Sequence, residues 1–208
     1  MSDIVVPNLE EVGDGFLSSN QCLINFRAPK LEKVGTSFLS DCVGLKNIFL
    51  PNLKKIGDSF LYYNQKIINI GLPSAEKIGA HFMCCNSNLE NINITSVKKI
   101  GDYFLSSNLA LTEINLPSVI EIGGRFLCSN EKIKKIYMPK VKFIQERFLY
   151  SNKAIKILQF NQLMRIGKNF LSNNKHKIRM YAPKIEITKY LGDNIKIVNN
   201  IEELYESN

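Results

Sequence analysis

The stretch IGDSFLYYN, residues 56–64, returns in close variants at a fixed interval: IGAHFMCCN begins at Ile78, IGDYFLSSN at Ile100 and IGGRFLCSN at Ile122. Its phenylalanine, which we call the marker, recurs every 22 residues at Phe16, Phe38, Phe60, Phe82, Phe104, Phe126, Phe148 and Phe170. Such regular spacing indicates a repeat protein, in which each unit is too small to bury its own apolar face and is covered by its neighbours. We therefore expect a solenoid with the markers in its core.

The positions around the marker are nearly as regular. Glycine stands three residues before it in every repeat except the one with Gln145, which indicates a positive φ or a close approach of two backbones. Asp14, Asp58 and Asp102 directly follow the glycine and are suited to cap a single helical turn. Asparagine stands four residues after the marker, except at Cys42. We expect a buried ladder in which these amides bond loop backbone groups of their own and the adjacent coil.

The remainder of each unit reads Leu-x-x-Ile-x-Leu-Pro-x-Leu, as in LTEINLPSV from Leu111 and IKKIYMPKV from Ile133. The alternation of apolar and polar residues is typical of a short, half-buried strand. Proline then ends the strand, because it cannot donate to a ladder. We expect one such strand per coil, side by side in a parallel sheet.

This pattern resembles the leucine-rich repeats, and within them the BspA-like subfamily. The resemblance rests on Ile-Gly-x-x-Phe, on the Asn/Cys position and on Leu-x-x-Ile-x-Leu-Pro, and it covers residues 4 to about 185. It implies an α/β repeat solenoid, right-handed and curved, with a parallel sheet of about nine short strands on its concave face and short helical turns and loops elsewhere. It also implies that the protein works by binding, usually of other proteins. Many relatives are surface or secreted proteins of microbes that attach to host or matrix components.

We expect a single leucine-rich repeat domain over residues 1–208. A partial first coil covers residues 1–11, the 22-residue repeats cover 12–185, and a closing segment covers 186–208. In this last segment Gly192 stands where a marker is due, and NIKIVNN followed by IEELYESN predicts a strand and a short helix that seal the last coil. The first strand has a bare edge that invites pairing, so self-association through this N-terminal edge is an expected possibility.

The two x positions of each strand should face outwards and form a surface roughly 40 Å across, given about 4.8 Å per strand. That breadth suits a protein or an extended peptide better than a small metabolite, which needs a deep pocket. Aromatic and arginine side chains are the usual anchors of interfaces. The candidate partner contacts are Arg27, Phe49, Asn93, Asn115, Lys135, Tyr137, Arg179 and Tyr181. The asparagines at the outward positions of the first coils could instead form a neutral solvated face.

The charge is uneven along the chain. The net charge is +8, yet residues 1–104 carry 10 basic and 10 acidic side chains, so the excess lies in the second half. Between Arg125 and Lys184 there are 15 basic residues but only two acidic ones, Glu131 and Glu146. A basic field attracts acidic proteins, nucleic acids or anionic lipids and glycans. We favour an acidic protein, because the basic residues are scattered around the coil and no nucleic-acid-binding motif accompanies them. The alternatives are anion binding through residues 125–184 and, as the resemblance implies, an adhesion-type role at a surface.

No catalytic signature is present: there is no Gly-x-x-x-x-Gly-Lys-Ser/Thr loop, no Gly-x-Ser-x-Gly elbow and no His-Glu-x-x-His helix. The five cysteines include no Cys-x-x-Cys pair, which favours reduced thiols over disulfides or zinc. We therefore expect a non-enzymatic protein-interaction module without cofactor or metal. With no signal sequence and no apolar run of about 18 residues, a cytoplasmic location is the default expectation, and export by an unrecognised route is the alternative.

Overall fold

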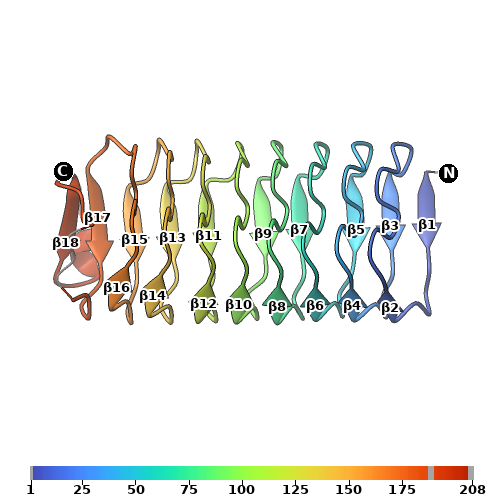
Figure 1. Ribbon diagram of the computed structural model, residues 1–208, viewed down its shortest axis with the longest axis horizontal. Coiled ribbons are helices and arrows are strands. Elements are labelled where there is room, and N and C mark those ends of the chain that lie inside the picture. The colour runs from blue at the N-terminus through green and yellow to red at the C-terminus, as the bar shows by residue number, and fades with distance from the viewer. Residues whose placement is uncertain (1, 187–189, 206–208) are drawn as a thin grey trace.

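The computed structural model describes residues 2–186 and 190–205. Its coils stand side by side in a nearly straight row from the N-terminus to the C-terminus (Figure 1). The fold class predicted from the repeat is confirmed: the protein is a solenoid of parallel strands. The described residues contain a single helical element, the 3-10 helix η1 (Glu202–Leu204). The solenoid is thus built almost wholly from strands and turns.

Each coil contributes one strand to a first row, which we call the long-strand face. Its strands are β1 (Asp3–Val5), β3 (Asn25–Arg27), β5 (Asn47–Phe49), β7 (Asn69–Gly71), β9 (Asn91–Asn93), β11 (Glu113–Asn115), β13 (Lys135–Tyr137), β15 (Ile157–Gln159) and β17 (Ile178–Tyr181). Paired strands are parallel and shifted by one repeat, so that Asn115 stands beside Tyr137. The central side chain of each strand points inwards and its neighbours mostly point outwards, as the alternation predicts.

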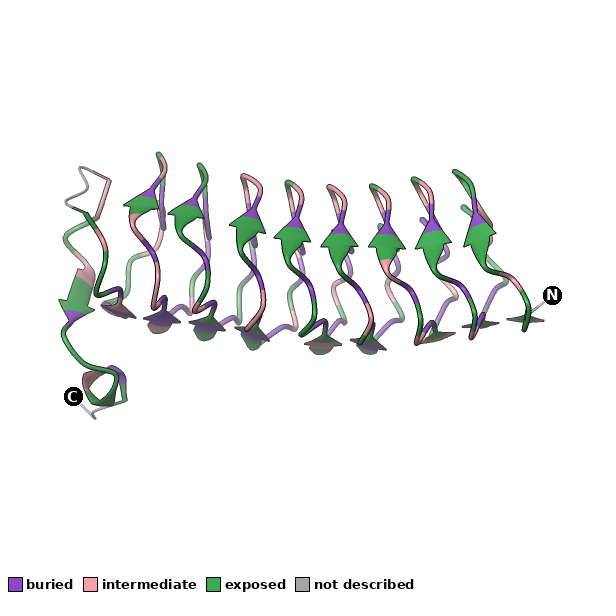
Figure 2. Ribbon diagram, turned by 90° about the horizontal axis from the view of Figure 1, so that it is seen from below, coloured by how far each residue is buried: buried purple, intermediate pink, exposed green. Residues whose placement is uncertain are grey.

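A second row of two-residue strands, the short-strand face, was not predicted. It comprises β2 (Glu11–Val12), β4 (Lys33–Val34), β6 (Lys55–Ile56), β8 (Lys77–Ile78), β10 (Lys99–Ile100), β12 (Glu121–Ile122), β14 (Phe143–Ile144) and β16 (Arg165–Ile166). Figure 2 looks onto this row, in which the first residue of each strand is exposed and the second is buried. Two residues are too few for an alternation to show in the sequence.

The repeated glycine follows each short strand because neighbouring backbones meet there. A Cβ on Gly101 would lie 2.6 Å from the backbone nitrogen of Ala80, and the Gly101 N–H donates to the Ile78 carbonyl at 3.0 Å. Close approach, and not a positive φ, therefore explains this column. At Gln145 the glycine is missing, and the row is interrupted between β12 and β14, which belong to separate sheets.

The markers form a continuous stack of rings through the core. Consecutive ring centroids, from Phe16 to Phe170, are 4.9–5.8 Å apart, with interplanar angles of 4–17°. From Phe38 to Phe148 these rings are almost completely buried. The stack runs along the solenoid axis and ties every coil to the next.

The predicted asparagine ladder is also present. Asn108 is fully buried; its Nδ2 donates to the Met83 carbonyl at 2.9 Å and to the Ser106 carbonyl at 3.4 Å, and its Oδ1 accepts from the Asn86 N–H at 3.1 Å. One amide thus satisfies groups of its own coil and of the preceding coil. Cys42 replaces the amide by donating its thiol to the corresponding carbonyl of Leu17 at 3.1 Å.

The single helical turn expected after the glycine is absent, so the assignment of the aspartates as helix caps is wrong. The turn instead alternates in conformation, with positive φ at Tyr103 (56°), Leu105 (50°) and Ser107 (60°). This alternation aims successive N–H groups at opposite neighbours: Tyr103 donates to Gly124 in the next coil, and Leu105 donates to Phe82 in the preceding one. The Asp102 carboxylate likewise accepts from the Gly124 N–H of the next coil at 2.8 Å.

The described part of the C-terminal segment contains one strand and one short helical element. β18 (Ile195–Val198) pairs in parallel with β17 and extends the long-strand row by one strand. η1 follows it, and its Leu204 is fully buried. Residues 206–208 of the predicted helix lie outside the described residues.

Candidate interaction surface

The candidate contacts all lie at outward positions of the long strands. Six of them are exposed: Arg27, Phe49, Asn93, Asn115, Lys135 and Tyr137. The other two, Arg179 and Tyr181, lie in β17 near the C-terminal end of the row and are half-buried. The long-strand face is therefore open over β3 to β13 and partly covered beyond it.

Arg27 and Phe49 form a pair on adjacent strands. The guanidinium carbon of Arg27 lies 4.3 Å from the centroid of the Phe49 ring, which is within the range of a cation–π interaction. The contact holds the ring in place although 43% of Phe49 remains exposed. A large apolar side chain that is both exposed and ordered is suited to anchor a partner, because little conformational entropy remains to be lost.

Between Phe49 and Tyr137 the same column falls to smaller side chains. Gly71, Asn93 and Asn115 occupy the three intervening strands, so Phe49 and Tyr137 are four strands apart. The row is interrupted between β5 and β7 and between β9 and β11, which belong to separate sheets. Tyr137 itself is 36% exposed. This stretch of the long-strand face, from Phe49 to Tyr137, thus has small side chains in the middle and an aromatic side chain at each end.

The closing segment limits this surface at its C-terminal end. The Tyr205 hydroxyl reaches the Gln159 Oε1 at 3.5 Å, and the Arg179 Nη1 donates to the Glu203 carbonyl at 3.3 Å. Tyr205 also lines a hollow of about 400 Å³ together with Lys135 and Tyr137. Repeat alignment places Arg179 and Tyr181 on the sheet but cannot show what folds over them, because the closing segment has no counterpart in the other coils.

The outward asparagines of the first coils bond to one another. The Asn25 Nδ2 donates to the Asp3 Oδ1 at 2.6 Å, and the Asn47 Nδ2 donates to the Asn25 Oδ1 at 2.7 Å. Asn91 donates to Asn69 in the same way, at 2.7 Å. These amides are already paired along the row, which favours the reading of a solvated structural ladder over that of a binding patch.

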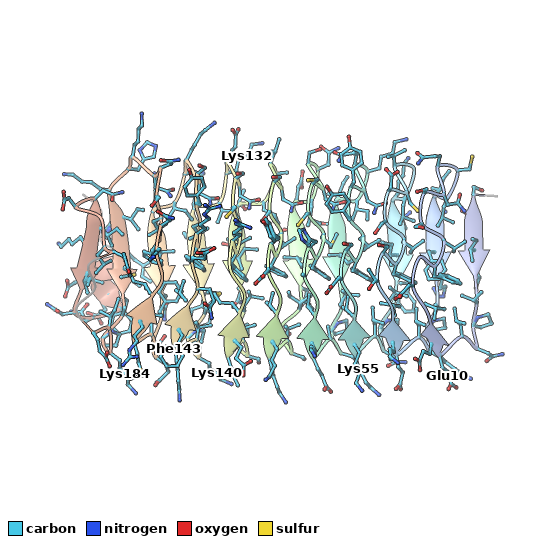
Figure 3. All side chains as sticks on the ribbon, in the orientation of Figure 1. Glu10, Lys55, Lys132, Lys140, Phe143 and Lys184 are labelled. Carbon is cyan, nitrogen blue, oxygen red and sulfur yellow. The ribbon has the colours of Figure 1, made fainter. Side chains whose placement is uncertain are left out.

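The short-strand face carries a second set of charges that the sequence reasoning missed. Lys33, Lys55, Lys77 and Lys99 stand in register on adjacent strands. Glu11 pairs with Lys33 and Glu121 pairs with Lys99 at the two ends of this run. Figure 3 shows Glu10 and Lys55 extending outwards along this edge of the solenoid. The signal lay in the residue before each Val or Ile of the repeat, which is Lys or Glu in six coils.

The thiols of Cys42, Cys84 and Cys128 donate hydrogen bonds to backbone carbonyls of neighbouring coils. Burial raises the pKa of Cys84 to about 12 and also raises the pKa values of Cys42 and Cys128. The Cys84 Sγ donates to the Tyr103 carbonyl at 2.7 Å, and Ser106 makes the equivalent bond to Arg125 at 3.1 Å one coil later. Within the described ranges, no three His, Cys, Asp or Glu side chains lie close enough to share a metal ion.

No helix in the described part of the chain is long and apolar enough to cross a bilayer.

Comparison with known proteins agrees with this architecture. The sequence model of a family described as "BspA type Leucine rich repeat region (6 copies)" matches residues 1–110 and 76–195. A leucine-rich repeat protein from Bacteroides ovatus ATCC 8483, known from its crystal structure, is similar in fold, with a TM-score of 0.53 and 17% sequence identity. The match covers 95% of this chain but only 62% of that protein. No curated protein sequence matches.

Proposed function

The chain belongs to the BspA-type leucine-rich repeat family, and from this premise we propose that it is a non-enzymatic module that binds an acidic protein through its long-strand face. Membership of the family suggests a protein-interaction or adhesion-type role. Such repeats form a scaffold whose variable positions supply the contacts. The geometry of these positions supports one face over the others.

The distribution of exposed apolar side chains is the observation that carries the proposal. Thirteen large apolar side chains are exposed among the described residues. Six of them lie in a long strand or directly before one: Val5, Ile24, Phe49, Ile68, Tyr137 and Ile197. Their exposure leaves apolar area in water, at a cost of about 25 cal/mol per Å². The aromatic members of this set, Phe49 and Tyr137, are of the kind that anchors protein interfaces.

The charges on the same face support an acidic partner. Lys135 is exposed on β13, and Lys134, also exposed, stands directly before β13. Glu113 on β11 is the one carboxylate at an outward position of β11, β13 and β15. A positive surface beside aromatic anchors speeds association with a negative surface and disfavours basic competitors.

The proposal is tested by placing a photo-crosslinking amino acid at position 49 or 137 in the native host and identifying the captured protein. Both positions should capture the same partner. The dissociation constant of that partner is then measured for the Phe49→Ala/Tyr137→Ala variant. We expect an affinity at least about tenfold lower, because each anchor of an interface is typically worth more than 1 kcal/mol.

Phe143→Ala provides the matched control. Phe143 is an exposed phenylalanine on the short-strand face (Figure 3), so its removal changes apolar area to a similar extent without touching the proposed surface. The control should bind like the wild type. Equal affinity of the wild type and the Phe49→Ala/Tyr137→Ala variant would overturn the assignment of the long-strand face.

A further inference from the structure

A hollow of about 840 Å³ opens at the C-terminal end of the long-strand row. It lies where β15, β17 and β18 begin, beyond the stretch of the long-strand face between Phe49 and Tyr137. Its charged and polar lining consists of Lys156, His176, Lys177, Arg179, Asp193, Asn194 and Lys196.

The hollow is strongly positive. Four cationic side chains and one carboxylate line it, which gives a formal charge of +3 with His176 neutral. Three other surface hollows carry +1, 0 and −1 by the same count. Like charges that line one hollow repel one another, and an anion between them relieves that repulsion. Among these four hollows the positive excess is thus specific to the one at the C-terminal end.

Lys177 breaks the rule of the repeat at this position. In the seven coils of β3 to β15 the equivalent residue is a leucine or isoleucine that is at most 1% exposed: Leu23, Leu45, Ile67, Leu89, Leu111, Ile133 and Ile155. Lys177 is exposed and lines the hollow. The buried place is taken instead by Ile178, which is 1% exposed although its equivalents Lys134 and Lys156 are exposed, so Lys177 is turned outwards. Local departures of this kind are expected at functional sites.

The backbone around the hollow is fixed by hydrogen bonds. The Asn194 Nδ2 donates to the carbonyls of Asn174 and His176 at 3.0 and 2.8 Å. The Ile178 N–H donates to the Asn194 carbonyl at 2.9 Å. These bonds join the loop before β18 to the loop before β17. The backbone that carries Lys177 and Lys196 is therefore fixed, while their side chains are exposed to solvent.

We infer that this hollow binds anions that carry two or more neighbouring phosphate or sulfate groups, with Lys156, Lys177 and Lys196 as the contacts. Lysine ammonium groups act as point charges on flexible stems, which suits a tetrahedral oxyanion that can be approached from several directions. The one planar fork, Arg179, donates to the Glu203 carbonyl and forms part of the wall. The inference goes beyond the protein-binding proposal and does not depend on it.

Isothermal titration of the full chain with inorganic tripolyphosphate tests the inference, with a disulfated disaccharide as a second ligand that separates phosphate from sulfate sources. We expect Lys177→Leu, which restores the residue type of the repeat, to fold and to bind tripolyphosphate at least about fivefold more weakly. Lys156→Gln and Lys196→Gln should weaken binding similarly. Each substitution should lower the slope of log K against log salt concentration by about 1.

Lys55→Gln is the control, because it removes one exposed lysine from the short-strand face and changes the net charge equally. Its affinity should stay within about twofold of the wild type, as expected for a substitution outside the site. An equal loss in Lys55→Gln and Lys177→Leu would show diffuse attraction and overturn the site, as would unchanged binding by Lys177→Leu. Equally tight binding of a hexaglutamate peptide would overturn the assignment to phosphate and sulfate. The Phe49→Ala/Tyr137→Ala variant should keep its tripolyphosphate affinity, which separates the two proposals.

Discussion

Single polar groups in the core decide how one coil meets the next. The amide of Asn108 holds a carbonyl of its own coil, a carbonyl of the preceding coil and an N–H of the preceding coil at once. A thiol can take this place with weaker bonds, as Cys42 does by donating to the Leu17 carbonyl and accepting from the Asn20 backbone N–H. Because the amide both donates and accepts, an asparagine at this position satisfies more of the backbone than any apolar residue could.

We predict that Asn108→Ala lowers the free energy of unfolding by about 2–4 kcal/mol, because buried groups that lose a partner cost about 1–3 kcal/mol each. The groups in question are the Asn86 N–H and the Met83 carbonyl. Urea unfolding followed by circular dichroism measures the change. Asn93→Ala removes an exposed amide from the long-strand face and should change stability by less than about 0.5 kcal/mol. Similar values for the two variants would contradict the buried ladder.

The thiols give a second test at this scale. Since the pKa of Cys84 is raised to about 12, almost none of it is thiolate at pH 8, and the thiolate is the reactive form. Cys22 is exposed. At pH 8 a disulfide reagent should therefore modify Cys22 quickly and Cys84 only after the chain is unfolded in denaturant. Equal rates in the native protein, resolved by mass spectrometry of the peptides, would contradict the burial of Cys84.

At the scale of the element, the strands and turns act as ladders between coils. The long strands could be predicted, because Leu-x-x-Ile-x-Leu-Pro carries a visible alternation and a terminator. The short strands could not, because Lys99–Ile100 is one outward and one inward residue and its pairing depends on the neighbouring coils. The turn was predicted wrongly for a related reason. An aspartate after a glycine suits a helix cap, and only the stacked structure shows that the Asp102 carboxylate accepts from an N–H of the next coil.

Gly101→Ala tests whether these ladders need close approach. The added Cβ would lie 2.6 Å from the Ala80 nitrogen, which forces backbone to move and should cost about 1–3 kcal/mol. Gly71→Ala is the matched control, because a Cβ at Gly71 would meet nothing within 4 Å; it should be neutral or slightly stabilising. Thermal unfolding of both variants measures the difference. A harmless Gly101→Ala would show that the coils are farther apart than the structure places them.

At the scale of the whole molecule, stacking separates what holds the coils together from what faces outwards. The burial of the markers and the asparagine ladder could be predicted because the markers recur without exception and the asparagines with the one exception of Cys42. Residues that recur at the repeat period occupy equivalent places in a solenoid. The functional surface follows less directly. Alignment of the repeats placed Phe49, Tyr137 and Arg179 at outward positions of the strands. Whether such a position is exposed depends on the closing segment, which contacts Arg179 but leaves Phe49 exposed. Non-repeating parts of a chain cannot be placed by the period of the rest.

Distances between spin labels along the long-strand face test the stacking itself most directly. Double electron–electron resonance is measured between position 135 and position 47, 25 or 3, in a background with Cys22→Ser, Cys85→Ser and Cys128→Ser, which leaves only the buried Cys42 and Cys84. These pairs lie four, five and six coils apart. At about 4.8 Å per coil, the account predicts distances that rise in equal steps from about 19 to about 29 Å. Distances that do not increase with the number of coils would contradict the stacked solenoid and every surface assigned to it.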